Sequence, residues 1–140
     1  MSLDCQDGLG EYKFKGSFYS GEFLNSKIHG NGIFKTKKGY SYNGGWLNGV
    51  KEGLAVEISK KGHVYKGNFS QNRRHGYGAC SIESTKFMKD ISYSGNWFYG
   101  SMCGQGELTY FRQVKYGRDK VSEKNTLVGQ FINGIYQGRL

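Results

Sequence analysis

Residues 42–55 read YNGGWLNGVKEGLA, and this pattern of aromatic and glycine residues recurs along the chain. Tyr42, Gly44 and Trp46 alternate with their neighbours, so they share one face of an extended segment. The following residues 47–53 are rich in Asn and Gly, which is typical of a turn. A second extended segment, residues 55–59, comes next. One copy of the pattern therefore predicts a β-hairpin.

Five copies begin at residues 19, 42, 65, 93 and 127. The first two steps between copies are equal, and the last two contain insertions of five and eleven residues relative to them. Gly8 and Gly10 indicate the tail of a partial repeat before the first copy. The residues that define the copies are Tyr19, Gly21, Phe23, His29, Gly30 and Gly32; Tyr42, Gly44, Trp46, Gly49, Gly53 and Ala55; Tyr65, Gly67, Phe69, His75, Gly76 and Gly78; Tyr93, Gly95, Trp97, Gly100, Gly104 and Gly106; and Leu127, Gly129, Phe131, Gly134 and Gly138.

The spacing Tyr-x-Gly-x-Trp-x-x-Gly, with His-Gly-x-Gly closing two copies, resembles the MORN repeat (membrane occupation and recognition nexus). The resemblance extends from about Gly8 to Leu140, although Leu127 replaces a leading tyrosine and the fifth copy stops before its second strand. The expected fold is all-β: an elongated, twisted antiparallel sheet of tandem β-hairpins. About ten strands, about 4.8 Å apart, give a sheet about 45 Å long. We expect one array over residues 8–140 and a disordered segment 1–7.

Composition excludes several classes of protein. The 11 Tyr, 9 Phe and 2 Trp residues argue against a disordered chain. The sequence contains no apolar run long enough for a transmembrane helix, and its first residues do not resemble a signal peptide. Cys5, Cys80 and Cys103 form no CxxC pair, as is typical of reduced thiols in the cytosol. A cytoplasmic location is expected, with attachment to the cytoskeleton or to a membrane as further alternatives.

Residue types that carry chemistry do not gather at any spacing typical of an active site. His29 and His75 occupy the same position in repeats that are not neighbours, which does not make a metal pair. Cys103 takes that position in the fourth copy without an identifiable base. The Gly-x-Gly pairs lack the Lys or Ser of a phosphate-binding loop. The sequence therefore predicts no catalytic site, no metal site and no cofactor.

Two surfaces are candidates for binding a partner. The first is the aromatic face of the sheet, which suits a peptide or a partner helix, unless the rings only pack against one another. Its candidate residues are Tyr42, Trp46, Tyr65, Phe69, Tyr93, Trp97, Phe98, Tyr99 and Met102. The second surface is the edge formed by turns between hairpins. Its candidate residues are Lys37, Lys38, Lys60, Lys61, Lys86 and Lys89.

The basic edge has three interpretations, which the net charge of +9 does not separate. Lysines at sheet edges prevent edge-to-edge aggregation. They can also hold anionic lipid headgroups, at about 1 kcal/mol for each basic residue, or an acidic protein. Nucleic acid is not expected as a partner, because no recognition motif for it is visible. Lys27, Lys51, Arg73 and Arg74 are expected at the opposite edge, in the turns within hairpins.

The functional hypothesis is a non-catalytic scaffold or adaptor that binds a protein partner through the sheet. The family resemblance implies a role in cytoskeletal or ciliary assembly, and homodimers formed through terminal repeats. One alternative is a module that binds anionic phospholipid and targets membranes through the basic edge. Another is a regulatory domain of a larger enzyme, because members of the family are joined to lipid kinases and to a SET-type histone lysine methyltransferase.

Overall fold

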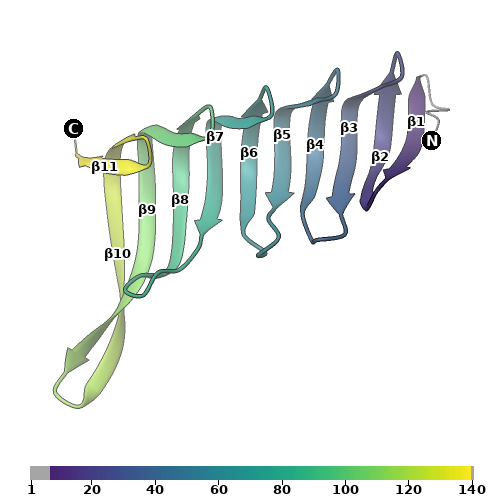
Figure 1. The fold of residues 1–140 in the computed structure, drawn as a ribbon. Helices are drawn as coiled ribbons and strands as arrows, with labels where there is room; N and C mark the ends of the chain where they lie inside the picture. Colours follow the sequence, from purple (N-terminus) through teal and green to yellow (C-terminus); the bar gives the residue numbers. More distant parts are fainter. Residues whose placement is uncertain (1–6, 140) are drawn as a thin grey trace.

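The computed structural model describes residues 7–139, which form one open antiparallel sheet of eleven strands. Strands that are neighbours in sequence are neighbours in space, so the sheet is a row of hairpins (Figure 1). This confirms the predicted all-β hairpin array. The strands are β1 (Gly8–Phe14), β2 (Ser17–Leu24), β3 (Lys27–Thr36), β4 (Ser41–Leu47), β5 (Val50–Ile58), β6 (Val64–Ser70), β7 (Arg73–Ile82), β8 (Lys89–Phe98), β9 (Ser101–Tyr116), β10 (Asp119–Ile132) and β11 (Ile135–Gly138).

The segment expected to be disordered, residues 1–7, lies outside the described residues except for Asp7. The Asp7 carboxylate accepts a hydrogen bond from the backbone N–H of Asn25 at 2.8 Å. Within residues 7–139, the structure contains no helix that is long and apolar enough to cross a membrane.

The turns within hairpins are shorter than the sequence indicated. The predicted turn 47–53 consists of two residues, Asn48 and Gly49, with φ of 48° and 88°. Two successive residues with positive φ match the right-handed twist of the flanking strands, which favours such tight turns in hairpins. The second strand therefore starts at Val50 rather than at residue 55, and a bulge between Gly44 and Trp46 restores the register.

The core is a single file of rings on one face of the sheet. Successive rings meet edge to face with centroids 4.8–5.8 Å apart, which is a favourable geometry for aromatic pairs. We call this set the aromatic file. In spatial order it consists of Phe23, Tyr19, Trp46, Tyr42, Phe69, Tyr65, Trp97, Tyr93 and Phe131.

Hydrogen bonds to the backbone fix the rings of the file. Each of its four tyrosines donates its hydroxyl proton to the carbonyl three residues further along, at 2.8 Å. Trp46 and Trp97 donate from Nε1 to the carbonyls of Gly32 and Gly78. Glycine allows this close approach, since a Cβ on Gly78 would lie 2.2 Å from the Tyr65 hydroxyl oxygen. The tyrosine rings therefore lie close against the glycine backbone of the neighbouring strand.

The two insertions take different forms. The five-residue insertion is the loop between β7 and β8, whereas the eleven-residue insertion lengthens β9 and β10. Within the described chain, β8 reaches only to Phe111 of β9, so residues 112–123 form a two-stranded arm beyond the sheet (Figure 1). The fifth repeat does not stop before its second strand, because β11 pairs with the end of β10.

Candidate binding surfaces of the sheet

Six of the nine predicted partner-binding residues belong to the aromatic file. Tyr42, Trp46, Tyr65, Phe69, Tyr93 and Trp97 are each at most 8% exposed. Their surfaces contact one another and the glycine backbone, so little area is left for a partner. These six rings are core residues, and any partner on this face must contact the side chains around them.

Of the other three predicted residues, Phe98 and Tyr99 lie together with ring centroids 4.9 Å apart, but Met102 does not join them. The Phe98 side chain is 60% exposed, and the Tyr99 ring stacks on His75 with centroids 4.2 Å apart. Met102 pairs with Trp97 across β8 and β9 and packs against the core on the aromatic face. Because Phe98 follows Trp97 in an extended strand, its side chain points to the opposite face. The structure therefore separates Phe98 from Met102.

Two rows of partly or fully buried side chains lie beside the file on the aromatic face, one residue from each repeat. The first row lies opposite the second ring of each repeat and consists of Ile28, Lys51, Arg74 and Met102, followed by Tyr136. The second row lies beside the tyrosines and consists of Phe34, Glu57, Cys80 and Leu108. Charged side chains occur in these rows only at Lys51, Glu57 and Arg74, in the middle of the array.

These three side chains and Tyr40 form what we call the charged cluster. The Glu57 carboxylate accepts hydrogen bonds from Lys51 Nζ at 3.1 Å, from Arg74 Nη2 at 3.2 Å, and from the Tyr40 hydroxyl. The side chains of Lys51, Arg74 and Glu57 are 19%, 28% and 13% exposed. Both cations also lie over rings: Lys51 Nζ is 4.8 Å from the Tyr40 centroid, and Arg74 Cζ is 4.5 Å from that of Tyr65.

The cluster keeps Glu57 ionised despite its burial. Burial is the largest single influence and by itself would raise the pKa of Glu57. The hydrogen bond from Tyr40 and the positive charges of Lys51 and Arg74 outweigh it, so the pKa of Glu57 lies below its usual value of 4.5. The site is therefore a carboxylate shared by two cations, with one positive charge in excess.

Sequence reasoning missed this cluster and placed its cations wrongly. Lys51 and Arg74 were expected in the turn edge, but they lie in strands β5 and β7 on the aromatic face. The reason is the two-residue turn, which brings the residues after it into the sheet. Glu57 could have been found from alternation, because it stands in the second strand where other repeats carry Phe34, Cys80 and Leu108.

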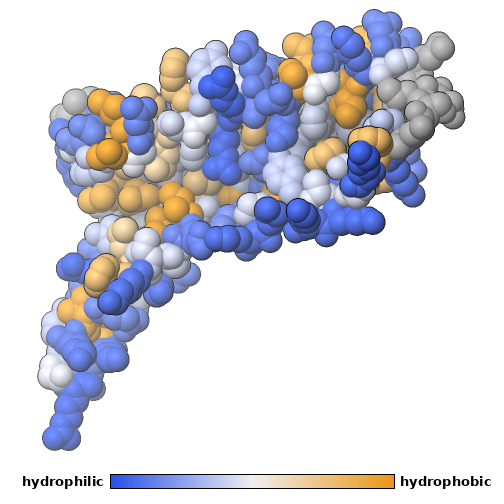
Figure 2. All heavy atoms as spheres, in the orientation of Figure 1, coloured by the Kyte–Doolittle hydropathy of each residue, from blue (hydrophilic) through white to orange (hydrophobic). Residues whose placement is uncertain are grey.

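The six predicted basic-edge residues are all exposed, and we call them the lysine edge. Lys37, Lys38, Lys60, Lys61 and Lys86 lie in the turns that join hairpins, and Lys89 begins β8. Blue, hydrophilic side chains run along this lower edge of the array in Figure 2. Lys61 pairs with Glu83 at 2.9 Å, but both side chains are more than 60% exposed, so the pair contributes little to stability.

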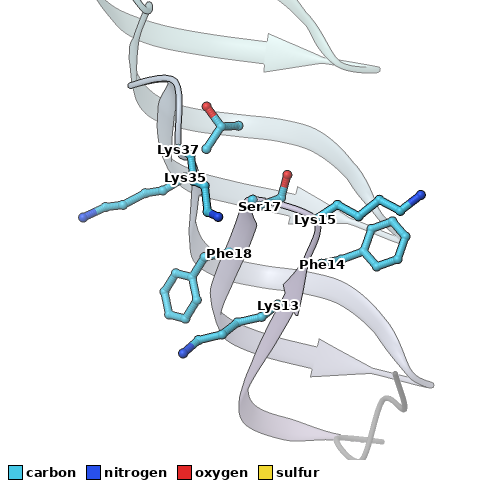
Figure 3. A pocket seen from close by; sticks show the side chains of 9 residues that line it. Lys13, Phe14, Lys15, Ser17, Phe18, Lys35 and Lys37 are labelled. Carbon is cyan, nitrogen blue, oxygen red and sulfur yellow. The ribbon is translucent and has the colours of Figure 1, made fainter.

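An open hollow of about 470 Å³ adjoins the N-terminal end of the lysine edge (Figure 3). Its walls come from β1, β2 and β3 and from the turns after β1 and β3. A second hollow, of about 620 Å³, continues along the turns toward Lys60. The side chains labelled in Figure 3 are Lys13, Phe14, Lys15, Ser17, Phe18, Lys35 and Lys37. Phe14 is 49% exposed, so this region combines basic side chains with an accessible ring.

Two of the three histidines have structural roles. The Nδ1 atoms of His29 and His75 accept hydrogen bonds from the backbone N–H groups of Asn48 and Tyr99, in the turn of the next repeat. Glu52 holds the equivalent position in the second repeat and accepts from Gln71 in the same way. This repeat position therefore links successive turns. Among the described residues, no three His, Cys, Asp or Glu side chains gather as metal ligands would.

Comparison with known proteins agrees with the repeat geometry. The family model of the MORN repeat matches residues 19–39, 42–64, 65–82 and 93–111. Over 98 residues, 70% of this chain, the sequence is 38% identical to alsin of Rattus norvegicus and 37% identical to alsin of Homo sapiens. The matched part is only 4% of the length of these relatives.

Proposed function

Since the chain belongs to the MORN-repeat family, we propose that it is a non-catalytic adaptor that binds a protein partner on the aromatic face of its sheet. The observation that carries the proposal is the half-buried rows on that face. Ile28 and Phe34 on one side of the charged cluster, and Met102 and Leu108 on the other, are partly exposed apolar side chains that pack against the aromatic file. A surface of this kind suits a partner segment that completes their burial.

The lysine edge has an explanation that needs no partner. Lysines at the edges and turns of a sheet prevent association with other sheets. Half-buried cations in the middle of an apolar face have no such general role. This difference favours the aromatic face as the primary binding surface. The cysteine pattern suggests a cytoplasmic setting for such an adaptor, and the family resemblance suggests a role in cytoskeletal or ciliary assembly.

Charged substitutions on the aromatic face should abolish capture of the partner. We would replace Ile28 and Met102 by lysine, the residue that the second repeat carries at the same position. Two added charges cannot be buried under an apolar partner surface without a large desolvation cost. In affinity capture from cell lysate, the partner should be retained by the wild-type chain and lost from the double variant.

A second variant provides the control for this experiment. It reverses Lys37, Lys38, Lys60 and Lys61 to glutamate, at the lysine edge, and should retain the partner. Both variants should keep the far-UV circular dichroism of the wild type. Loss of the partner from the edge variant alone would contradict the proposal and move the binding surface to the lysine edge.

The hollow beside the lysine edge favours a second candidate function, attachment to an anionic membrane surface. Lys13, Lys15, Lys35, Lys37 and the accessible ring of Phe14 surround it, and Lys38 and Lys60 line the second hollow beside it. Basic residues near a bilayer contribute about 1 kcal/mol each, and aromatic side chains favour the headgroup region. In a longer protein that contains such an array, including an enzyme joined to it, this edge would then hold the rest of the protein at the membrane.

The edge variant, with its four reversed lysines, should bind anionic vesicles about 1000-fold more weakly than the wild type, if each lysine contributes about 1 kcal/mol. Sedimentation with vesicles of phosphatidylcholine and phosphatidylserine, mixed two to one, measures the effect, and binding should fall as salt increases. A control with the same net charge reverses Lys27, Lys66, Lys115 and Lys120 instead. Equal losses of vesicle affinity in the two variants, or vesicle binding that does not change with salt concentration, would rule out a specific role for the lysine edge.

A further inference from the structure

We infer that Lys51 and Arg74 form a docking site for a carboxylate of the protein partner, an Asp or Glu side chain flanked by apolar residues. The inference rests on the proposed function, because it assigns a partner chemistry to the aromatic face. It follows from the position of the charged cluster, from its unused hydrogen-bond donors, and from the apolar side chains on either side.

The position of the cluster indicates a role other than stability. The other repeats place Ile28 and Met102 where Lys51 and Arg74 lie, and Phe34, Cys80 and Leu108 where Glu57 lies. Apolar side chains therefore satisfy this fold at every equivalent position. A partly buried ion pair generally stabilises a protein no better than well-packed apolar residues of similar size. The second and third repeats thus carry charges that the sheet itself does not require.

The donors of Arg74 are well placed for a second acceptor. A guanidinium carries five N–H donors in a fixed fork, and Arg74 contacts Glu57 through Nη2. Its Cζ lies 4.5 Å from the Tyr65 ring centroid and 5.2 Å from that of Trp97, which holds the group in one orientation. The side chain nevertheless remains 28% exposed. An oriented, accessible fork matches the bidentate geometry of a carboxylate.

Charge favours the same ligand. Glu57 neutralises one of the two cations, so the cluster retains one positive charge in a chain with a net charge of +9. Lys51 Nζ donates to Glu57 and lies beside the Tyr40 hydroxyl, which leaves it close to any acceptor that Arg74 binds. A carboxylate from the partner would balance the second cation, so that the site would then hold two carboxylates and two cations. The site therefore selects an acidic group over a neutral or basic one.

The flanking side chains define the rest of the partner segment. The residues of the first row lie on alternate strands, β3, β5, β7 and β9, so neighbours in the row are about 10 Å apart. Ile28 lies beyond Lys51 on one side, and Met102 lies beyond Arg74 on the other. A fitting segment has an acidic residue between Lys51 and Arg74 and an apolar residue about 15 Å away on each side of it.

A random library of 15-residue peptides displayed on phage tests the inference with a defined probe. Selection on the immobilised wild-type chain should enrich peptides that contain one Asp or Glu between apolar residues. In a synthetic copy of the best peptide, replacing that acidic residue by alanine should lower affinity at least tenfold. The same replacement should change affinity less than twofold when the chain carries Arg74→Met, the residue of the fourth repeat. This double-mutant cycle isolates the contact between the two groups.

Arg73→Met is the matched control. It removes the same charge as Arg74→Met, but Arg73 precedes Arg74 in the strand and points to the opposite face. This variant should keep the tenfold dependence on the acidic residue, and both variants should keep the far-UV circular dichroism of the wild type. Peptides that bind the aromatic face equally well without their acidic residue would overturn the inference and leave the proposed function intact. A library that yields no binders would contradict the proposed function itself. So would selected peptides whose affinity is unchanged by Ile28→Lys and Met102→Lys.

Discussion

Replacing Trp97 by alanine should lower the free energy of unfolding by about 3–5 kcal/mol. The indole is only 7% exposed and meets Tyr65 and Tyr93 with centroids 5.4 Å apart on both sides. Its Nε1 also donates a buried hydrogen bond to the Gly78 carbonyl at 3.1 Å. The substitution removes two ring contacts and the hydrogen bond to that carbonyl. In a repeat array, where stability comes from neighbouring repeats, it weakens the junction between the third and fourth copies.

Urea unfolding followed by circular dichroism measures this loss. Phe98→Ala is the control, because Phe98 is the next residue in the same strand and its ring is 60% exposed. It should cost less than about 1 kcal/mol, as exposed substitutions usually do. Trp46→Ala should resemble Trp97→Ala, since Trp46 donates to Gly32 in the same way. A loss below about 1 kcal/mol at either tryptophan would show that the aromatic file is not the core.

Raising the pH from 10 to 12 should unfold the array. Burial is the main cause that raises the pKa of Tyr19, Tyr65 and Tyr93 to about 12, and it raises that of Tyr42 further. In the unfolded chain these phenols lose their protons near pH 10. The unfolded state therefore releases these phenol protons at a lower pH than the folded state does. The stability linked to the neutral phenols is complete below pH 10 and is lost as the pH rises toward 12.

Two spectra distinguish this behaviour from simple titration. Absorbance in the near ultraviolet follows ionised tyrosine, and far-UV circular dichroism follows the sheet. The four buried phenols of the aromatic file should ionise in one steep transition together with the loss of the sheet, separate from any ionisation of the seven tyrosines outside the file. Tyr93→Phe is the matched variant, since it removes one of the buried phenols and the hydrogen bond to Asn96. It should cost about 0.5–1.5 kcal/mol at neutral pH and make the alkaline loss less steep. Ionisation of all 11 tyrosines near pH 10 with an intact sheet would contradict the burial of these hydroxyls.

The repeat period was enough to predict the architecture from sequence. Tyr42, Gly44 and Trp46 recur in phase, and only a hairpin row places such residues on one face throughout. The period also placed Lys37 and Lys60 in equivalent turns, where the structure has them. These features depend on local alternation and on turn chemistry, both of which are visible in a single sequence.

The candidate site was harder to predict because it depends on register. Whether Lys51 points to the turn edge or lies over rings is decided by a two-residue turn at Asn48–Gly49 and by the bulge that follows. A shift of one residue moves a side chain to the other face of a sheet. The rings of the aromatic file were assigned to binding for a related reason: spacing places them on one face but does not reveal how closely they cover one another.

The arm at residues 112–123 makes this protein a convenient host for grafting. Its two strands pair with each other and, within the described chain, with no third strand, so the ring-lined core does not depend on it. Its tip, Gly117 and Arg118, is an exposed tight turn, the kind of position where inserted sequence is best tolerated. A fluorescent reporter joined there would extend the ribbon outward from the array. The reporter would then detect binding to the repeats without any substitution in the repeats themselves.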